Sequence, residues 1–276
     1  MLRLSPLNTD RKDFVLLRLS LNLPATGLIS SAAVLLTACS STPNIPLAGA
    51  KAHSVSSAVI YQTESKEYPT LARYVYSNAI AALPSAFNNN DVVVMDVDET
   101  VLDNSQYQRE RESAGLGYSS ESWNAWVVRK EATLVPGVSN FIQRVIERGG
   151  KIALVTNRDK SLDNHTWENL LALGLPLTPD NACMLGRTPA DKAAMGQEGI
   201  VNDKDLRRLS VKKGTVNCSN STNQKAWSTP HNIVMQVGDN IEDFANTTQE
   251  SANVDELLPH IGKTLFLLPN PMYGSW

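Results

Sequence analysis

Two acidic residues directly follow an apolar run, in the sequence Asp96-Val97-Asp98-Glu99-Thr100. If the chain stays extended here, Asp96 and Asp98 point to the same side, because alternate side chains of a strand share a face. Two close carboxylates raise each other's proton affinity unless a cation lies between them. One can then stay ionised while the other carries a proton, which is the arrangement that acid–base catalysis uses. A solvated acidic turn would contain the same residue types, so this alternative stays open.

A second acidic cluster lies in residues 238–244, Gly-Asp-Asn-Ile-Glu-Asp-Phe. Asp239 and Asp243 are four residues apart, and they would share one face of a helix that begins here. Acids are also common at helix N-termini because they interact favourably with the helix dipole. However, two acidic clusters at strand ends would repel each other without a cation. Carboxylate oxygens without His or Cys suit Mg²⁺, so the two clusters together indicate a magnesium site.

A third polar group follows an apolar run, in Val155-Thr156-Asn157-Arg158-Asp159. The hydroxyl of Thr156 and free backbone N–H groups at a strand end can hold phosphate oxygens. The same residues are also typical of an ordinary turn from a strand to a helix.

Three short apolar runs each lead into one of these polar groups, at residues 92–95, 152–155 and 233–237. Short runs rich in β-branched residues are typical of strands that are covered on both faces, as in a parallel sheet. Ligands of open α/β sheets bind beyond the carboxyl ends of the strands. The sequence therefore predicts that all three polar groups lie at the ligand-binding edge.

Helical patterns accompany the predicted strands. Residues 136–148 begin with Pro136 and residues 161–173 stop at Gly174, as expected of helix ends. A further helix is expected from about residue 67 to the residue before Pro84. One side of this helix would carry Leu71, Tyr74, Val75, Asn78 and Ala82. The alternation of strands and helices predicts an open α/β sheet with right-handed crossovers.

The composition favours one α/β domain and disfavours one class of partner. A chain of 276 residues with 42% hydrophobic content can bury a substantial core. A net charge of −3 offers no basic surface for a nucleic acid polymer, so we expect none as a partner.

The first part of the chain resembles a bacterial lipoprotein signal. A basic region is followed by a mostly apolar stretch that ends in Leu36-Thr37-Ala38-Cys39. Residues 1–38 would be removed, and Cys39 would become the lipidated first residue of the mature chain. Pro24 and Gly27 interrupt the apolar stretch, which disfavours the alternative of a retained transmembrane anchor.

The residues after Cys39 indicate where the mature protein would reside. Residues 39–57 are rich in Ser, Ala and Pro and are typical of a flexible tether. Ser40, in place of Asp, resembles the signal for sorting to the outer membrane. We expect a cell-envelope lipoprotein that faces the periplasm or the cell surface. In that oxidising compartment Cys183 and Cys218 could form a disulfide, or they could be two small buried residues.

The order of the motifs resembles the haloacid dehalogenase (HAD) superfamily. D-x-D-E-T, V-T-N-R, a lysine and G-D-N-x-x-D-F follow one another as in that superfamily, and the four aspartates resemble subfamily IIIB, the bacterial class C acid phosphatases, which are often lipoprotein 5′-nucleotidases. The resemblance covers roughly residues 58–276. It is supported by further motifs at residues 96–107, 121–126, 136–137 and 268–276. It implies a Rossmann-like core, with helices on both faces of a parallel sheet, and a small helical cap.

The resemblance also implies a role for each matching residue. Asp96 would attack phosphorus and form an aspartyl-phosphate, and Asp98 would act as general acid and base. Mg²⁺ would be held by Asp96, the backbone carbonyl of Asp98, and Asp239, with Asp243 close by. Thr156 and Asn157 would bind the phosphate.

The family also places a phosphate-binding lysine between the second and fourth motifs. We predict Lys225 for this role, although few residues separate it from the last predicted strand. Lys212 and Lys213 are alternatives, and Lys192 is a more distant one. Residues 196–224 resemble an unusual polar insertion, and their relation to the site stays open.

Residues 104–135 are long enough to form the cap over the site. They contain four aromatic residues, Tyr107, Tyr118, Trp123 and Trp126. These rings could stack on a nucleobase or nicotinamide ring, or they could form the core of the cap.

We therefore predict a magnesium-dependent acid phosphatase that acts on small phosphomonoesters, including nucleoside monophosphates. The alternatives are an exported ligand-binding lipoprotein without activity and a phosphotransferase on the same fold. The motifs of other hydrolases, G-x-S-x-G and H-E-x-x-H, are absent from the sequence. The preferred substrate and the oligomeric state stay open.

Overall fold

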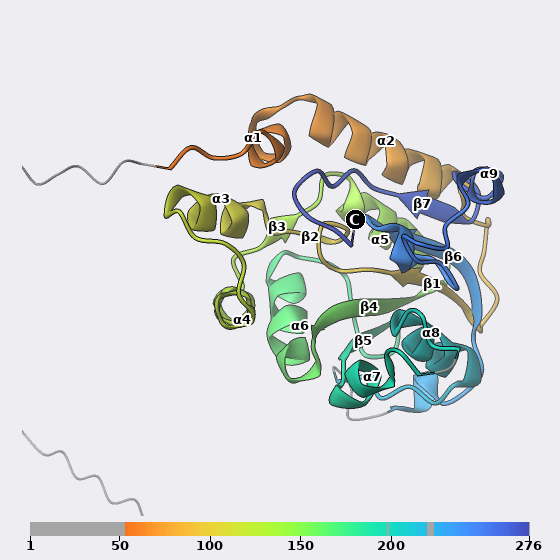
Figure 1. Cartoon of the computed structure of the whole chain (residues 1–276). Coiled ribbons are helices and arrows are strands. Elements are labelled where there is room, and N and C mark those ends of the chain that lie inside the picture. The colour runs from red at the N-terminus through yellow and green to blue at the C-terminus, as the bar shows by residue number, and fades with distance from the viewer. Residues whose placement is uncertain (1–52, 198, 220–223, 276) are drawn as a thin grey trace, which may run out of the picture. The chain divides into compact units, whose positions relative to one another are not determined.

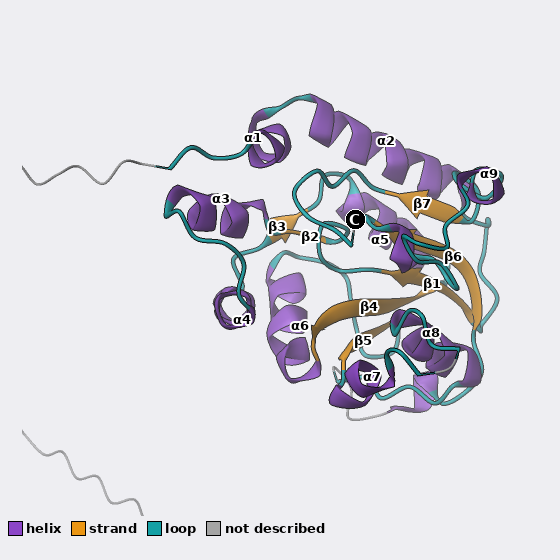
Figure 2. Cartoon of the chain, viewed as in Figure 1, coloured by secondary structure: helices purple, strands orange, loops and turns teal. Residues whose placement is uncertain are grey.

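A parallel sheet forms the centre of the fold (Figure 2). The computed structural model describes residues 53–197, 199–219 and 224–275, and its five-stranded sheet has the order β5-β4-β1-β6-β7. The strands are β1 (Asp91–Met95), β4 (Lys151–Asp159), β5 (Ala182–Arg187), β6 (Asn232–Gly238) and β7 (Leu265–Leu267). Every neighbouring pair in this sheet is parallel, which confirms the predicted α/β sheet.

The central strand β1 is buried on both of its faces. Val93 and Met95 belong to one hydrophobic cluster, whereas Val92 and Val94 belong to a second cluster. Alternate residues of a strand point to opposite faces, so the two clusters lie on opposite sides of the sheet. A continuous apolar run is therefore what this strand requires.

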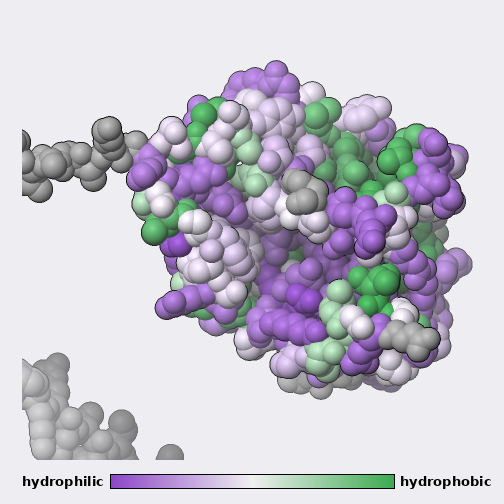
Figure 3. Space-filling model, viewed as in Figure 1, coloured by the Kyte–Doolittle hydropathy of each residue, from purple (hydrophilic) through white to green (hydrophobic). Residues whose placement is uncertain are grey.

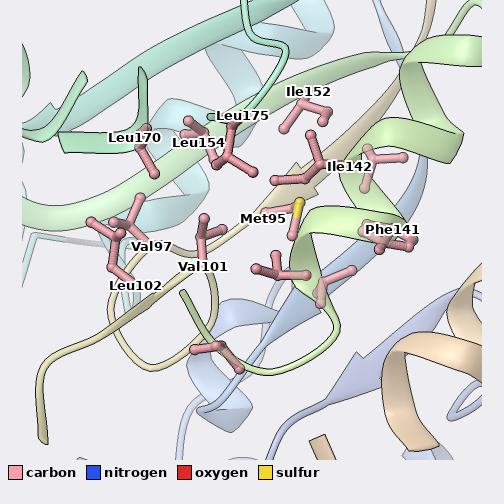
Figure 4. Close-up of a cluster of buried hydrophobic side chains, with 14 of the residues drawn as sticks. Met95, Val97, Val101, Leu102, Phe141, Ile142, Ile152, Leu154, Leu170 and Leu175 are labelled. Atoms are coloured by element: carbon pink, nitrogen blue, oxygen red, sulfur yellow. The ribbon is translucent and has the colours of Figure 1, made fainter. Parts of the chain in front are cut away.

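Helices α2 (Glu67–Ala82), α5 (Val138–Glu147) and α6 (Asp163–Ala172) contribute to the first cluster (Figure 1). Figure 4 shows Phe141 and Ile142 of α5 in the same hydrophobic cluster as Met95 and Ile152. All three helices were predicted, but the side of α2 that carries Leu71 and Tyr74 is not the side that it buries. Leu71 and Tyr74 are exposed, whereas this helix buries Tyr68, Ala72, Tyr76 and Ala79.

Helix α8 (Lys204–Lys213) packs on the second cluster through Val211. Along the chain, α8 follows the short helix α7 (Pro189–Ala194) and precedes η2 (Gln224–Trp227). A disulfide joins Cys183 of β5 to Cys218, so the two cysteines are paired rather than free. Residues 196–224 were predicted to be a polar insertion. This prediction is wrong for α8, because the helix packs on the sheet and buries one of its faces.

The strands β1, β4 and β6 match the three predicted runs, whereas β5 and β7 were not predicted. Strand β4 also continues past its apolar run to Asp159, with an irregular register after Val155. Thr156 and Asn157 therefore lie on a strand and not in the turn that follows it.

Residues 104–135 contain the two cap helices, α3 (Ser105–Ser113) and α4 (Ser120–Arg129). An antiparallel pair, β2 (Leu102–Asp103) and β3 (Thr133–Leu134), closes the base of this segment. Tyr107 and Trp126 are each 2% exposed, and the Tyr107 ring lies 5.1 Å from that of Trp123. Tyr107 and Trp126 therefore form the core of the cap.

The remaining elements are α1 (Ser57–Glu64), η1 (Lys160–Leu162), η3 (Ile241–Asp243) and α9 (Val254–Leu257). Within residues 53–197, 199–219 and 224–275, no helix has the length and apolar character needed to cross a membrane. The predicted signal at residues 1–38, Cys39 and most of the predicted tether lie outside the described residues.

Candidate active site

Asp96 and Asp98 lie where the central strand β1 ends. Asp96 is 6% exposed, and its backbone N–H donates to the carbonyl of Val237 on β6 (3.0 Å). The chain then turns sharply, because Glu99 has a φ of 58°. The left-handed region is strained for a residue with a side chain, so this turn needs support from its surroundings.

The buried carboxylate of Glu99 supplies that support. Gln62 Nε2 (2.6 Å), the Asn104 backbone N–H (3.1 Å) and the Tyr273 hydroxyl (2.7 Å) all donate to it. Burial raises the pKa of Glu99 to about 8, and the nearby charge of Asp103 acts in the same direction. Glu99 thus joins α1, the start of the cap and the C-terminal segment beneath the site.

Asp239 and Asp243 follow β6 at the same edge of the sheet. Asp243 lies in η3, where its Oδ2 accepts a hydrogen bond from the Asn240 backbone N–H (2.9 Å). A side chain at Gly238 would collide with this carboxylate, since a Cβ there would lie 2.2 Å from Asp243 Oδ2. Asp239 accepts hydrogen bonds from Thr100 Oγ1 (3.2 Å) and Asn270 Nδ2 (2.8 Å). Each carboxylate is therefore fixed by a different segment of the chain.

The structure brings Asp96, Asp239 and Asp243 together, so that one carboxylate oxygen of each lies within 4.8 Å of the others. Burial raises the pKa of Asp96 to about 7; Lys204 lowers it, and Asp243 raises it further. Burial and the charges of Asp243 and Asp96 also raise the pKa of Asp239 well above its usual value. Three carboxylates at such short separations, with Asp96 and Asp243 buried and Asp239 half-buried, repel one another and fit a divalent cation such as Mg²⁺.

Lys204, the first residue of α8, lies against this cluster. Its Nζ is 2.5 Å from Asp96 Oδ1 and 2.5 Å from Asp243 Oδ1. The Lys204 side chain is only 8% exposed. An ammonium group at this place can neutralise an anion that is bound at Asp96.

Asp98 is separate from the three-carboxylate cluster. Its Oδ1 accepts two hydrogen bonds from the buried Arg158, from Nε (2.9 Å) and Nη2 (2.7 Å). Thr156 Oγ1 donates to Asp98 Oδ2 (3.3 Å). Asp96 and Asp98 therefore have different surroundings although they are two residues apart.

Thr156 and Asn157 differ in their access to the site. Thr156 is fully buried and is not among the described residues that line the cavity. Asn157 is exposed and lines the cavity, and its Oδ1 accepts a hydrogen bond from Arg207 Nη2 (2.9 Å).

A cavity of about 630 Å³ opens above the aspartates. The cap contributes Tyr118, Trp123 and Asn124 to its wall, and the C-terminal segment contributes Tyr273 and Ser275. Figure 3 shows a hydrophilic hollow at the centre of the visible face. A volume of this size is typical of a site for a small molecule.

Residues 36–276 match the family described as HAD superfamily, subfamily IIIB (acid phosphatase). The chain belongs to this family of acid phosphatases.

Two solved structures support the assignment to the acid phosphatases. The class C acid phosphatase from Bacillus anthracis is 26% identical, with a TM-score of 0.63, over 79% of this chain and 84% of that chain. A structure of the Bacillus anthracis enzyme with tungstate bound is also 26% identical and covers the same shares of the two chains, with a TM-score of 0.61. These likenesses confirm the mostly parallel α/β fold and imply phosphomonoesterase activity.

The lysine that lies next to the aspartates of this acid phosphatase is Lys204. The structure does not place Lys225, which was predicted as the phosphate-binding lysine, at the site. Lys225 is exposed in η2 and is not among the described residues that line the cavity. Lys212 and Lys213 lie exposed at the other end of α8. Lys192 lines the cavity, but it pairs with Asp159 (3.1 Å).

Sequence reasoning missed Lys204 because α8 carries little apolar sequence. One signal was present: Lys204, Arg207, Arg208 and Val211 follow the spacing of a buried helix face, and all four are buried. Asn202 and Asp203, directly before them, are residues typical of a helix start. Arg158 was also missed as a partner of Asp98, because no local pattern pairs residues so far apart in the chain.

Proposed function

We propose that this acid phosphatase hydrolyses small phosphomonoesters, including nucleoside monophosphates, with Asp96 as nucleophile and Mg²⁺ as cofactor. The observation that carries this proposal is the position of Asp96. Its carboxylate lies at the base of a cavity, in contact with the ammonium group of Lys204 and next to two further aspartates.

The reaction would proceed in two steps. A carboxylate oxygen of Asp96 attacks phosphorus while the ester oxygen leaves with a proton from Asp98, so that an aspartyl-phosphate forms. A water molecule then attacks the phosphorus of this intermediate and gives its proton to Asp98, which releases phosphate and restores Asp96. Covalent catalysis of this kind divides one difficult displacement into two easier steps.

Lys204 would bind the phosphoryl group during both steps. Its ammonium group is held between Asp96 and Asp243 at the point where the phosphoryl oxygens would gather. Asn157, which lines the cavity, would provide a further contact with the phosphate. Thr156 would act from within β4, through its contact with Asp98.

The carboxylates of Asp96, Asp239 and Asp243 and the backbone carbonyl of Asp98 would hold Mg²⁺. When bound, the ion supplies charge stabilisation for the phosphoryl oxygens. The raised pKa values of Asp96 and Asp239 support this proposal, because burial and the neighbouring carboxylates disfavour their charged forms, and a bound cation would favour those forms.

The cap would select the rest of the substrate. Tyr118 and Trp123 line the cavity with their rings 6.4 Å apart, and Tyr118 is 65% exposed. Exposed aromatic rings can stack on a planar group such as a nucleobase. This supports nucleoside monophosphates as one class of substrate.

We also propose that the protein is an outer-membrane lipoprotein, anchored through Cys39 after removal of residues 1–38. The Cys183–Cys218 disulfide supports an oxidising compartment. Cells grown with labelled palmitate should incorporate the label into the wild-type protein and not into a Cys39→Ser variant. Equal labelling of the two would show that the lipid is attached elsewhere.

Phosphate release tests the proposed activity. The purified full-length protein should release phosphate from nucleoside monophosphates and p-nitrophenyl phosphate when Mg²⁺ is present. The rate should fall to background with a chelator and return with added Mg²⁺. A folded protein that releases no phosphate from nucleotides, sugar phosphates or aryl phosphates would overturn the proposal.

A further inference from the structure

The two oxygens of the Asp98 carboxylate have very different partners. Oδ1 accepts hydrogen bonds from Arg158 Nε (2.9 Å), Arg158 Nη2 (2.7 Å) and Asn104 Nδ2 (3.0 Å). Within the described residues, Oδ2 accepts a single long hydrogen bond, from Thr156 Oγ1 (3.3 Å). A carboxylate oxygen with three donors has little capacity left for a proton. The oxygen that can gain and lose a proton is therefore Oδ2.

The guanidinium group of Arg158 is itself held in place. Arg158 is only 2% exposed, and its Nη1 donates to Thr166 Oγ1 (3.1 Å) on α6. Its Nη2 also donates to Asn104 Oδ1 (3.1 Å). The same Asn104 oxygen accepts a hydrogen bond from Trp126 Nε1 (2.8 Å) on α4. Contacts from the core and from the cap thus fix the orientation of the arginine.

We propose that Arg158 is a positioning residue that binds Oδ1 of Asp98 and leaves Oδ2 to exchange the proton with the leaving group. This inference rests on the proposed function of Asp98 as general acid. The guanidinium group suits the task because its donors are rigid and it stays charged at all working pH values. A lysine at this position would keep the charge but could not donate the two hydrogen bonds that Nε and Nη2 of Arg158 both make to Oδ1.

The leaving group of the substrate provides a selective test. A basic alkoxide needs a proton in order to leave, whereas p-nitrophenolate leaves readily without one. A misplaced acid should therefore slow hydrolysis of an alkyl phosphate much more than that of an aryl phosphate. A residue that merely maintains the structure should affect all substrates equally.

We would measure kcat/KM for p-nitrophenyl phosphate, phenyl phosphate and methyl phosphate with the full-length protein in Mg²⁺. General acid catalysis contributes about 10²–10⁴-fold, so Arg158→Lys should lose roughly 10²-fold on methyl phosphate and less than about 10-fold on p-nitrophenyl phosphate. Arg158→Gln should also lose more activity on methyl phosphate than on p-nitrophenyl phosphate, and both losses should exceed those of Arg158→Lys. Asp98→Asn, which removes the acid itself, should show the steepest dependence of kcat/KM on the leaving group.

Arg207→Lys is the matched control. Arg207 is also a buried arginine near the cavity, but its side chain donates to Asn157, Asp191 and Asp203 rather than to Asp98. Its substitution should lower kcat/KM by the same factor on all three substrates. Thermal unfolding of each variant shows whether it folds. If Arg158→Gln does not fold, Arg158→Lys still provides the test.

The possible results are distinct. Equal losses on all three substrates for Arg158→Lys, or the same leaving-group dependence for Arg207→Lys, would overturn the role of Arg158. A wild-type protein that releases no phosphate would instead overturn the proposed function. A loss for Asp98→Asn that does not depend on the leaving group would show that Asp98 is not the acid.

Discussion

At the scale of single residues, Lys204 contacts Asp96 and Asp243, whereas Lys225 lies exposed outside the cavity lining. Lys204→Met should lower kcat by about 10²-fold or more, the usual effect of removing a fixed group that stabilises transition-state charge. Lys225→Met should keep kcat within about twofold of the wild-type value, since Lys225 is exposed and is not among the described residues that line the cavity. Phosphate release from p-nitrophenyl phosphate measures both. A larger loss of kcat for Lys225→Met than for Lys204→Met would instead indicate Lys225 as the phosphate-binding lysine.

The difference between these two lysines shows what sequence could predict at this scale. Asp96, Asp98, Asp239 and Asp243 were found because each follows an apolar run at the carboxyl edge of the sheet. Lys204 was not found, because its burial depends on carboxylates that are distant in sequence. A lysine is usually exposed, and only the ion pairs of the folded chain make this one an exception.

At the scale of secondary-structure elements, strand predictions succeeded where β-branched residues are continuous. β1, β4 and β6 have such runs, whereas β5 mixes Ala, Cys and Gly, and β7 has only three residues. The sequence pattern of α2 did not indicate its buried side, because two of the residues that face the core, Ala72 and Ala79, are small. Large residues on the opposite side, such as Tyr74, gave a misleading pattern.

The Cys183–Cys218 disulfide ties β5 to the segment after α8, across 35 residues of chain. Loop-closure entropy predicts a contribution of about 3–4 kcal/mol to the free energy of unfolding for a loop of this order. A reductant should therefore lower the urea midpoint of the wild-type protein. The Cys183→Ala/Cys218→Ala double variant should start at the lower midpoint and should not respond to reductant. An unchanged wild-type midpoint in reductant would show that the bond adds no stability.

His231, directly before β6, should make stability depend on pH. Burial lowers the pKa of His231, and the nearby charge of Lys151 lowers it further. Below about pH 6.5 the unfolded chain takes up a proton here that the folded protein resists, so stability falls as the pH falls. His231→Phe keeps a ring against Trp227 and should lose less stability between pH 7 and pH 5 than the wild type. An equal loss of stability in the wild type and in His231→Phe between pH 7 and pH 5 would contradict this expectation.

At the scale of the whole molecule, the site combines the sheet edge, the cap and the C-terminal segment. Asn270 reaches back from that segment to donate to Asp239 Oδ2 (2.8 Å), and Tyr273 donates to Glu99 Oε1 (2.7 Å). The sequence predicted the edge of the sheet and the cap, because topology and segment length determine them. It did not predict the contacts of the last residues, which only the closed fold creates.

Asn270→Ala should therefore weaken binding of Mg²⁺. Loss of a hydrogen bond to a metal-binding residue typically reduces metal affinity by about 10–100-fold. Calorimetric titration of the metal-free protein with Mg²⁺ measures the change directly, and activity at saturating Mg²⁺ should recover most of its wild-type value. Unchanged affinity would show that the C-terminal segment does not support the metal site.

The most direct test of the central claim is the rate of Asp96→Asn, because this variant keeps the size of the side chain and removes the nucleophile. Its Mg²⁺-dependent phosphate release should fall by at least about 10³-fold with a normal unfolding transition. Asp255→Asn, an exposed substitution on α9, should retain the wild-type rate. A folded Asp96→Asn variant that releases phosphate at the wild-type rate would contradict Asp96 as the nucleophile.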